Sequence, residues 1–181
     1  MAALVQVERK FASRRMLKPA PRGNFDAKHL KAIHKHIFQD VYEWAGEFRT
    51  VPLALPGQQF MPPEDLERGM SIIHQRLRSM RFLKGSDRKT FSDHAGRTIG
   101  DVNLLHPFRD GNGRTQRTFL KHLARNAGYE WDESKMSKHV WLQASYLACD
   151  GDYRLMSAAI KSGLSGRVNV RDQFKRSGRR M

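Results

Sequence analysis

Apolar residues recur every three or four positions through most of the 181-residue chain, a spacing that predicts amphipathic helices. The first such stretch is residues 25–44, with Asn24 as its expected N-cap. Its apolar positions are Leu30, Ile33, Ile37, Val41 and Trp44. Residues 62–83 resume the same period, with prolines and acidic residues at the start, where a helix accepts them. We therefore expect two helices that each bury one face.

Four further segments follow the helical period in the second half of the chain. They are residues 92–108, 114–128, 137–149 and 153–164. We expect Pro107 to break the first of them, Gly128 to stop the second and Asp152 to cap the last.

Between the first two helices the period changes from helical to alternating. Val51, Leu53 and Leu55 take alternate positions, and the proline-glycine pair at 56–57 offers a turn. Pro52 confines such a strand to the edge of a sheet. The expected fold class is therefore all-α, a compact helical bundle with one small β-hairpin.

Length and composition agree with one domain that has a sizeable core, because 39% of the residues are hydrophobic and 28% are charged. No segment approaches the roughly 18 apolar residues that span a bilayer, and the N-terminus has no apolar signal region, so we expect a cytoplasmic protein. Cys149 is the single cysteine, which excludes an internal disulfide and argues against a cysteine-based zinc site.

The formal net charge of +15 is concentrated at the two ends. Residues 1–22 and residues 166–181 each hold six Lys or Arg and one acidic residue, so each carries +5. We expect solvated, partly disordered termini around a domain at residues 23–165. Neither end has the interleaved aromatic residues of a single-strand binder, so direct nucleic-acid binding is not favoured.

Residues 106–117, HPFRDGNGRTQR, contradict local helical preference. They open the helix at 114–128 with Arg114 and Arg117 in its first turn, where cations oppose the helix dipole at a cost of about 0.3–1 kcal/mol each. Backbone N–H groups of a glycine-containing loop at a helix N-terminus bind anions. The arginine pair and the loop together predict a polyanionic ligand.

Two further side chains of this stretch specify the chemistry. Asp110 would repel a bare phosphate, but a carboxylate suits Mg²⁺ that is shared with phosphate oxygens. His106 has a side chain whose ordinary pKa lets it accept a proton at neutral pH. These groups favour phosphoryl or nucleotidyl transfer. The plain structural alternative is a proline-containing turn in which Phe108 fills the core and the arginines are solvated.

The stretch resembles the signature of the Fic domain family, HPFx(D/E)GNGRxxR, at every fixed position. Upstream WAGEFRTV, at residues 44–51, and FMPP, at 60–63, agree with it. The resemblance implies a Fic-type helical bundle and a protein adenylyltransferase that moves AMP from ATP to a Tyr, Ser or Thr hydroxyl of a target protein. It covers about residues 25–160 and implies Mg²⁺ as the cofactor.

The resemblance also implies roles for individual residues. His106 would be the catalytic base and Asp110 the Mg²⁺ ligand. Asn112 would lie near the α-phosphate, within an anion hole formed with its two glycine neighbours. Phe108 would anchor the loop, and the two arginines would neutralise the outer phosphates. The full nucleotide-binding set is Phe108, Gly111, Asn112, Gly113, Arg114 and Arg117.

The hairpin resembles the flap on which family members dock an extended segment of the target by strand addition. The flap residues are Thr50, Val51, Pro52, Leu53, Ala54, Leu55, Gln59 and Phe60. The structural alternative is a local cover over the helices.

None of the seven glutamates follows a Ser or Thr by four positions, so the family's inhibitory [S/T]xxxE helix is absent from this sequence. The resemblance then implies the class that is inhibited by a separate small antitoxin, whose glutamate would pair with Arg117. For that class it also implies a bacterial toxin that acts on the ATPase subunits of DNA gyrase and topoisomerase IV.

Two other functions remain open at this point. Doc-like relatives are kinases and carry Lys where this chain has Gly113, and a basic helix-turn-helix protein would bind DNA without catalysis. A metal site at His29, His34 and His36 is not favoured, because their spacing scatters them around a helix; we expect a solvated face there.

Overall fold

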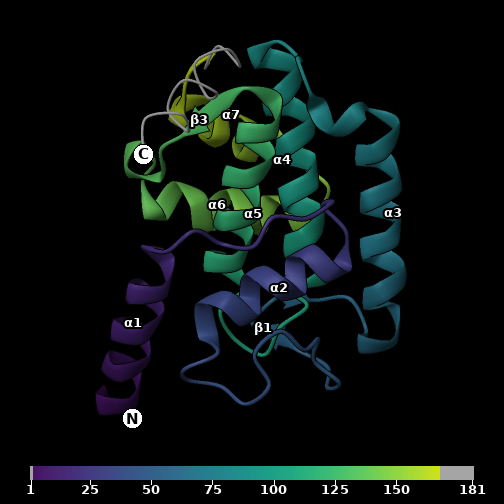
Figure 1. Cartoon of the computed structure of the whole chain (residues 1–181). Coiled ribbons are helices and arrows are strands. Elements are labelled where there is room, and N and C mark those ends of the chain that lie inside the picture. The colour runs from purple at the N-terminus through teal and green to yellow at the C-terminus, as the bar shows by residue number, and fades with distance from the viewer. Residues whose placement is uncertain (1, 168–181) are drawn as a thin grey trace, which may run out of the picture.

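The computed structural model describes residues 2–167 and shows an all-α fold (Figure 1). Its α-helices are α1 Ala2–Met16, α2 Ala27–Phe38, α3 Leu66–Ser79, α4 Arg88–Leu105, α5 Asn112–Ala127, α6 Lys138–Cys149 and α7 Arg154–Gly163. Short 3₁₀ turns lie at Pro63–Asp65, Arg81–Leu83 and Glu133–Lys135. The predicted fold class is confirmed.

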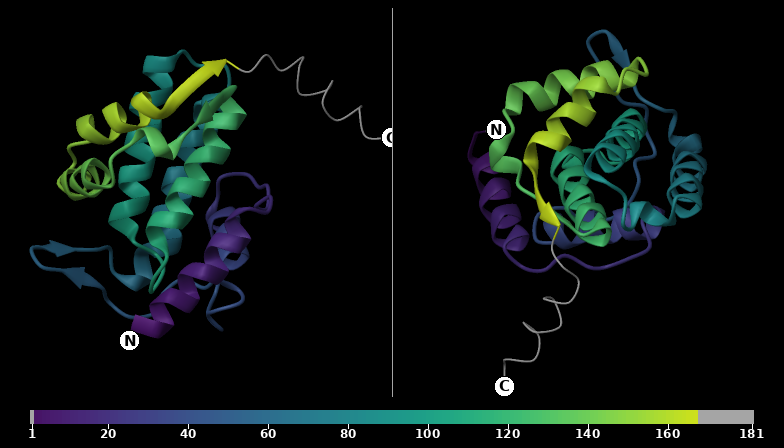
Figure 2. Two further views of the ribbon diagram at one scale, coloured as in Figure 1. Left: turned by 90° about the vertical axis from the view of Figure 1, so that its left-hand side faces the viewer. Right: turned by 90° about the horizontal axis from the view of Figure 1, so that it is seen from above.

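Helices α4 and α5 form the centre of the bundle, and the other helices surround them when the molecule is seen from above (Figure 2). Ile99 and Val102 of α4 and Phe119 and Leu123 of α5 have no exposed surface. Helix α4 approaches α7 closely at Gly96, where a Cβ atom would lie 2.2 Å from the Ser157 hydroxyl oxygen. The turn that joins α4 to α5 is therefore fixed at both ends by helices packed in the core.

Helix α2 is shorter than its apolar pattern predicts. Its N-cap is Asp26 and not the predicted Asn24. The Asp26 carboxylate accepts the His29 backbone N–H at 2.8 Å. It ends at Phe38, and turns occupy residues 39–46. Of the predicted apolar positions, Val41 and Trp44 lie beyond the end of the helix. Trp44 stacks on Tyr42, whose hydroxyl reaches Asp110 at the α4–α5 junction.

The predicted hairpin is confirmed as β1, Ala54–Leu55, paired antiparallel with β2, Gln58–Gln59. A second antiparallel pair joins β3, Tyr129–Trp131, to β4, Leu164–Arg167, and the hydrophobic pattern did not indicate it. The other predicted helices are present with shifted ends. Helix α4, for example, begins at Arg88 after the Asp87 cap, four residues before its predicted start.

The N-terminal basic segment is helical over Ala2–Met16, which corrects the expectation of partial disorder there, although most of its described side chains are exposed as expected. Ala12 is buried, and Arg15 forms an ion pair with Asp40 in the turns after α2, with both hydrogen bonds at 2.5 Å. The predicted basic tail at 166–181 lies outside the described residues from 168 onward. Within residues 2–167 no helix is long and apolar enough to cross a membrane.

Two of the histidines expected on a solvated face are buried. His34 has no exposed surface and His29 is 3% exposed, because α2 packs them against α5 and the α4–α5 junction. The His29 ring accepts the Phe25 N–H at Nδ1, so its proton is on Nε2, which lies 3.1 Å from both the Pro21 carbonyl and Nδ1 of His122. Burial lowers the pKa of His29 and lowers the pKa of His122 to about 4.

This histidine pair predicts that the fold loses stability as the pH falls from about 6.5 to about 4. In that window the unfolded chain binds protons that His122, with a pKa of about 4 in the folded protein, does not. The free energy of unfolding, measured with urea at several pH values, should decrease, and His122→Gln should flatten the decrease. The exposed His139→Gln variant is the control. Equal stability of the wild type at pH 6.5 and 4.5 would contradict this prediction.

Candidate active site

The motif residues lie at the turn between α4 and α5. His106 ends α4 in the left-handed conformation, with φ +44° and ψ +58°, which a non-glycine residue adopts only when its surroundings hold it there. Asn112 begins α5. Between them, the chain turns so that the end of one helix and the N-terminus of the next face the same hollow.

Arg49 holds the backbone on which His106 sits. Its side chain is 2% exposed and donates hydrogen bonds to four carbonyl oxygens. The acceptors and donor–acceptor distances are His106 at 2.8 Å, Val51 at 2.8 Å, Met61 at 2.5 Å and Leu105 at 3.1 Å. The Arg49 backbone N–H also donates to the Pro107 carbonyl at 2.8 Å. This one guanidinium therefore joins the end of α4 to both ends of the hairpin.

The His106 side chain is a neutral imidazole. Burial lowers its pKa to about 4. The hydrogen bond to the Asn103 carbonyl opposes this shift, the Arg49 charge adds a smaller lowering, and the Asp110 charge raises the pKa least. Its ring stacks on Phe60 of the hairpin, with centroids 3.9 Å apart and planes at 18°. At neutral pH this side chain can accept a proton.

The loop between the helices is closed by Asn112 and Gly111. The Asn112 amide donates to the Phe108 carbonyl at 2.7 Å and accepts the Phe108 N–H at 3.0 Å. Gly111 has φ +77°, and a Cβ atom there would lie 2.3 Å from Cε2 of Phe38. The Asn112 side chain is thus occupied by the loop itself, which leaves the backbone N–H of Asn112 at the hollow.

Phe108 lies in the core, 1% exposed, and stacks on His34 at 3.9 Å. The predicted nucleotide-binding residues other than Phe108 line one hollow of about 270 Å³ together with the predicted base and metal ligand. Its lining residues are His106, Arg109, Asp110, Gly111, Asn112, Gly113, Arg114 and Arg117. The structure thus brings together the residues that the motif singled out.

Both motif arginines have carboxylate partners within the chain, which the sequence did not indicate. Arg114 forms an ion pair with Glu8 of α1, and its guanidinium lies 4.6 Å from the centroid of the Phe38 ring. Arg117 pairs with Glu133 at 3.0 Å, and Lys121 pairs with the other oxygen of that carboxylate at 3.1 Å. These pairs compensate the cations that begin α5.

Asp110 has the donor chemistry that Mg²⁺ requires. Its carboxylate is exposed at the hollow, where Oδ1 accepts the Gly111 N–H at 2.5 Å and Oδ2 accepts the Tyr42 hydroxyl at 3.2 Å. Each oxygen retains a lone pair. Among the described residues no group of three or more His, Cys, Asp or Glu could hold a metal. A cation here would be shared between Asp110 and a ligand's oxygens, as Mg²⁺ is with nucleotides.

The predicted flap adjoins this hollow and extends away from the helices (Figure 2). Val51 and Leu55 are 48% and 55% exposed, while Phe60 lies on the His106 ring and donates its N–H to the Leu53 carbonyl at 3.4 Å. The remaining flap residues, Thr50, Pro52, Ala54 and Gln59, complete the exposed loop and strand pair. An extended peptide has access to this edge.

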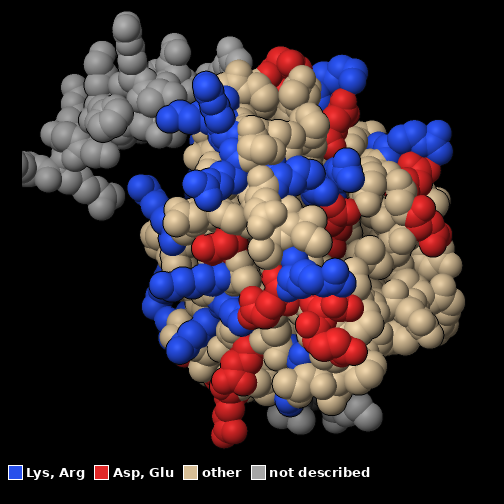
Figure 3. All heavy atoms as spheres, turned by 90° about the vertical axis from the view of Figure 1, so that its right-hand side faces the viewer, with Lys and Arg blue, Asp and Glu red and all other residues tan. Residues whose placement is uncertain are grey.

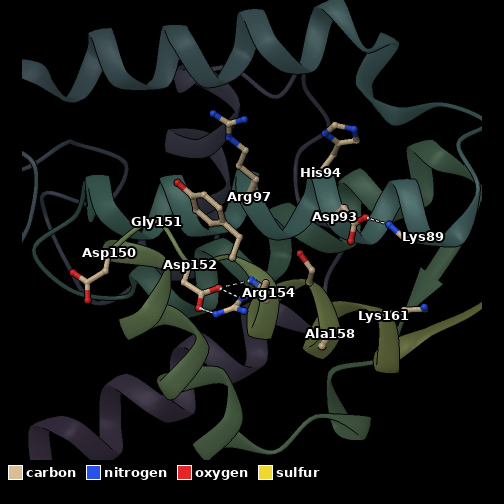
Figure 4. A pocket seen from close by; sticks show the side chains of 12 residues that line it. Lys89, Asp93, His94, Arg97, Asp150, Gly151, Asp152, Arg154, Ala158 and Lys161 are labelled. Atoms are coloured by element: carbon tan, nitrogen blue, oxygen red, sulfur yellow. Dashed lines mark hydrogen bonds and ion pairs between the residues drawn. The ribbon is translucent and has the colours of Figure 1, made fainter.

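A larger hollow of about 880 Å³ lies between α4 and α7, away from the motif (Figure 4). Its charges are partly paired with one another, Lys89 with Asp93 and Arg154 with Asp152, each at 2.7 Å. None of the predicted site residues lines it.

The chain belongs to the Fic/DOC family, whose model matches residues 24–124. It is 40% identical to the protein adenylyltransferase VbhT of Bartonella schoenbuchensis over 91% of this chain and 35% of that protein. It is 39% identical to the probable protein adenylyltransferase y4lH of Sinorhizobium fredii over 78% of this chain and 74% of that protein. The chain therefore spans about a third of VbhT and about three quarters of y4lH.

Solved structures agree with this assignment. The N-terminal Fic domain of a VirB-translocated Bep effector protein from Bartonella quintana, with bound ADP, superposes with a TM-score of 0.81 at 28% identity. The superposition covers 92% of this chain and 86% of that one. The family resemblance predicted from the motif is confirmed.

We expect Arg49→Lys to destabilise the fold. An ammonium keeps the charge but has three donors, which cannot span the four carbonyls that the guanidinium reaches. The free energy of unfolding should fall by about 1–3 kcal/mol, as for buried polar groups left unpaired, measured by urea denaturation. The exposed Arg154→Lys is the matched control. A loss no larger than that of the control would show that Arg49 does not hold the junction.

Proposed function

We propose that this protein transfers AMP from ATP to a hydroxyl side chain of a target protein. The observation that carries this proposal is the hollow at the α4–α5 turn, which one neutral imidazole, one carboxylate and three guanidinium groups line together with the N-terminus of α5. The protein adenylyltransferases named among its relatives support the same reaction.

In the proposed reaction His106 accepts the proton of the target hydroxyl. The hydroxyl oxygen then attacks the α-phosphorus of ATP, an O–P bond forms, and the bond to the β-phosphate breaks to release pyrophosphate. A neutral base with a lowered pKa is present in full at pH 7. Removing such a base typically costs about 10²–10⁴ in rate.

The phosphates would bind where α5 begins. Backbone N–H groups of the Gly111–Gly113 loop and the helix dipole attract anions there, and Arg114 and Arg117 add two positive charges to the lining of the hollow. Bound Mg²⁺ would be held by Asp110 and would neutralise negative charge on the leaving pyrophosphate. The ion pairs with Glu8 and Glu133 must loosen or extend to the nucleotide when it binds.

We further propose that the flap registers the target and that the protein is a bacterial toxin acting on the ATPase subunits of DNA gyrase and topoisomerase IV. The exposed edge at Val51 and Leu55 supports the docking step. A separate antitoxin would bring a glutamate to Arg117. Because Glu133 already pairs with Arg117, that glutamate would have to displace it.

Kinase chemistry and DNA binding are the alternatives. Gly113 leaves the first turn of α5 without the lysine of the Doc-like kinases, which favours AMP transfer. Against a DNA-binding surface, Lys and Arg side chains are interspersed with Asp and Glu on the face shown in Figure 3.

His106→Ala should abolish target modification while ATP binding survives. ATP labelled at the α-phosphate, incubated with the ATPase subunit of gyrase or with a bacterial lysate, reports AMP transfer, and calorimetry with ATP and Mg²⁺ reports binding. Label from the γ-phosphate in the target would instead establish kinase chemistry. Lost nucleotide affinity in His106→Ala would contradict its role as the base. Arg117→Ala is the contrasting variant, because it should weaken ATP binding.

Leu53→Pro should lower target modification at least about tenfold while ATP binding changes little. Leu53 faces β2, since its carbonyl accepts the Phe60 N–H, so proline at this position disrupts the hairpin on which an added strand would pair. The matched control is Leu53→Ala, which shortens the same side chain and keeps the N–H. Equal transfer rates for the two variants would show that main-chain pairing at the flap is not used.

A further inference from the structure

Two side chains from α2 and the turns that follow it bond to Asp110, although they are 76 and 68 positions away in the sequence. His34 bonds to its carbonyl oxygen and Tyr42 to its carboxylate. We propose that His34 and Tyr42 are positioning residues that orient Asp110 towards the metal ion of a bound nucleotide. The inference rests on the proposed function, because it takes Asp110 as the Mg²⁺ ligand.

The direction of the His34 bond follows from its two partners. The Gly46 backbone N–H can only donate, and it lies 2.9 Å from Nδ1, so Nδ1 carries no proton. The proton of the neutral ring is then on Nε2, which donates to the Asp110 carbonyl at 3.1 Å. His34 has no exposed surface, so water does not compete for this bond. The ring thus joins the turn at Gly46 to the motif loop.

Tyr42 fixes the other end of the same residue. Its hydroxyl donates to Oδ2 of Asp110 at 3.2 Å, while Oδ1 accepts the Gly111 N–H. A carboxylate oxygen can only accept a hydrogen bond, so the phenolic hydroxyl is the donor. Because each oxygen of the Asp110 carboxylate accepts one hydrogen bond, the orientation of the carboxylate plane is fixed.

Stacked aromatic rings hold both donors in place. The Tyr42 ring lies 4.2 Å from that of Trp44, with 14° between the planes, and Trp44 stacks on His34 at 5.7 Å. His34 in turn stacks on Phe108 of the motif at 3.9 Å. Asp110 itself is exposed and lies in a turn. Its orientation therefore depends on stacked rings, three of which, His34, Tyr42 and Trp44, belong to another part of the chain.

Matched variants separate the proposed positioning role of His34 and Tyr42 from a purely structural one. His34→Gln places an amide N–H near the position of Nε2 and keeps the bond to Asp110. His34→Asn reaches only as far as Nδ1 and keeps an acceptor for Gly46. Tyr42→Phe removes one hydroxyl from the ring stack. Tyr153→Phe is the control, because it removes the same kind of bond, to Asp101 at 2.6 Å, outside the site.

The decisive measurement is ATP binding by calorimetry, with Mg²⁺ titrated and with EDTA, on the full chain. Tyr42→Phe and His34→Asn should each raise the Mg²⁺ concentration for half-maximal enhancement of ATP binding by about tenfold or more, as loss of a partner that orients a metal ligand does. ATP binding in EDTA should change less than about twofold. His34→Gln and Tyr153→Phe should resemble the wild type, and Asp110→Asn should lose the Mg²⁺ dependence.

Hydrogen exchange of the 109–111 amides in the nucleotide-free protein gives a second readout. It should accelerate in Tyr42→Phe and His34→Asn and stay unchanged in Tyr153→Phe. The inference is overturned if Tyr42→Phe keeps the wild-type Mg²⁺ dependence, or if His34→Gln is as impaired as His34→Asn. If His34→Asn does not fold, Tyr42→Phe alone decides. A wild type that binds ATP without regard to Mg²⁺, or transfers no AMP, would instead refute the proposed function.

Discussion

The hydrogen bonds of Arg49 are the constraint on which the arrangement of the site depends. A buried guanidinium is costly unless its donors are satisfied, and here four carbonyl oxygens accept hydrogen bonds from it. Those carbonyls belong to the end of α4 and to the two sides of the hairpin. The same side chain therefore keeps His106 in its left-handed conformation, joins the hairpin to the bundle and helps to lower the pKa of the His106 imidazole.

The arginines of the motif oppose the dipole of α5, and the fold compensates them from two distant places. Glu8 comes from α1 and Glu133 from the turn after β3, and each pairs with one arginine. A triphosphate that enters the hollow offers the same kind of partner as these carboxylates. The free energy of binding the proposed substrate ATP would then be the difference between two sets of ion pairs, and the affinity would depend on residues far from the motif.

The sequence predicts those parts of the site whose residues are close together in the chain, and misses those that depend on contacts between distant residues. The residues at 106–117 are contiguous, so the sequence alone was enough to predict a base, a metal ligand and an anion-binding loop in one site. Arg49 lies within the quoted WAGEFRTV, but a single arginine does not reveal four carbonyl partners. Nothing near Glu8 indicates a pairing across more than 100 positions. The helix predicted over residues 25–44 was too long for a related reason. Trp44 lies in a loop beyond α2, but its spacing from the apolar residues of the helix is the same as if the helix continued.

The buried histidines show why such support escapes sequence reasoning. His34 and His36 are two positions apart, and only the fold decides that the first is enclosed beside Phe108 while the second is partly exposed. Once enclosed, the first ring must satisfy both nitrogens, and its partners are the backbone of Gly46 and of Asp110. The need to satisfy a buried polar ring thus ties the α2 segment to the motif loop. A motif supplies the reacting groups, and long-range bonds of this kind set their orientation.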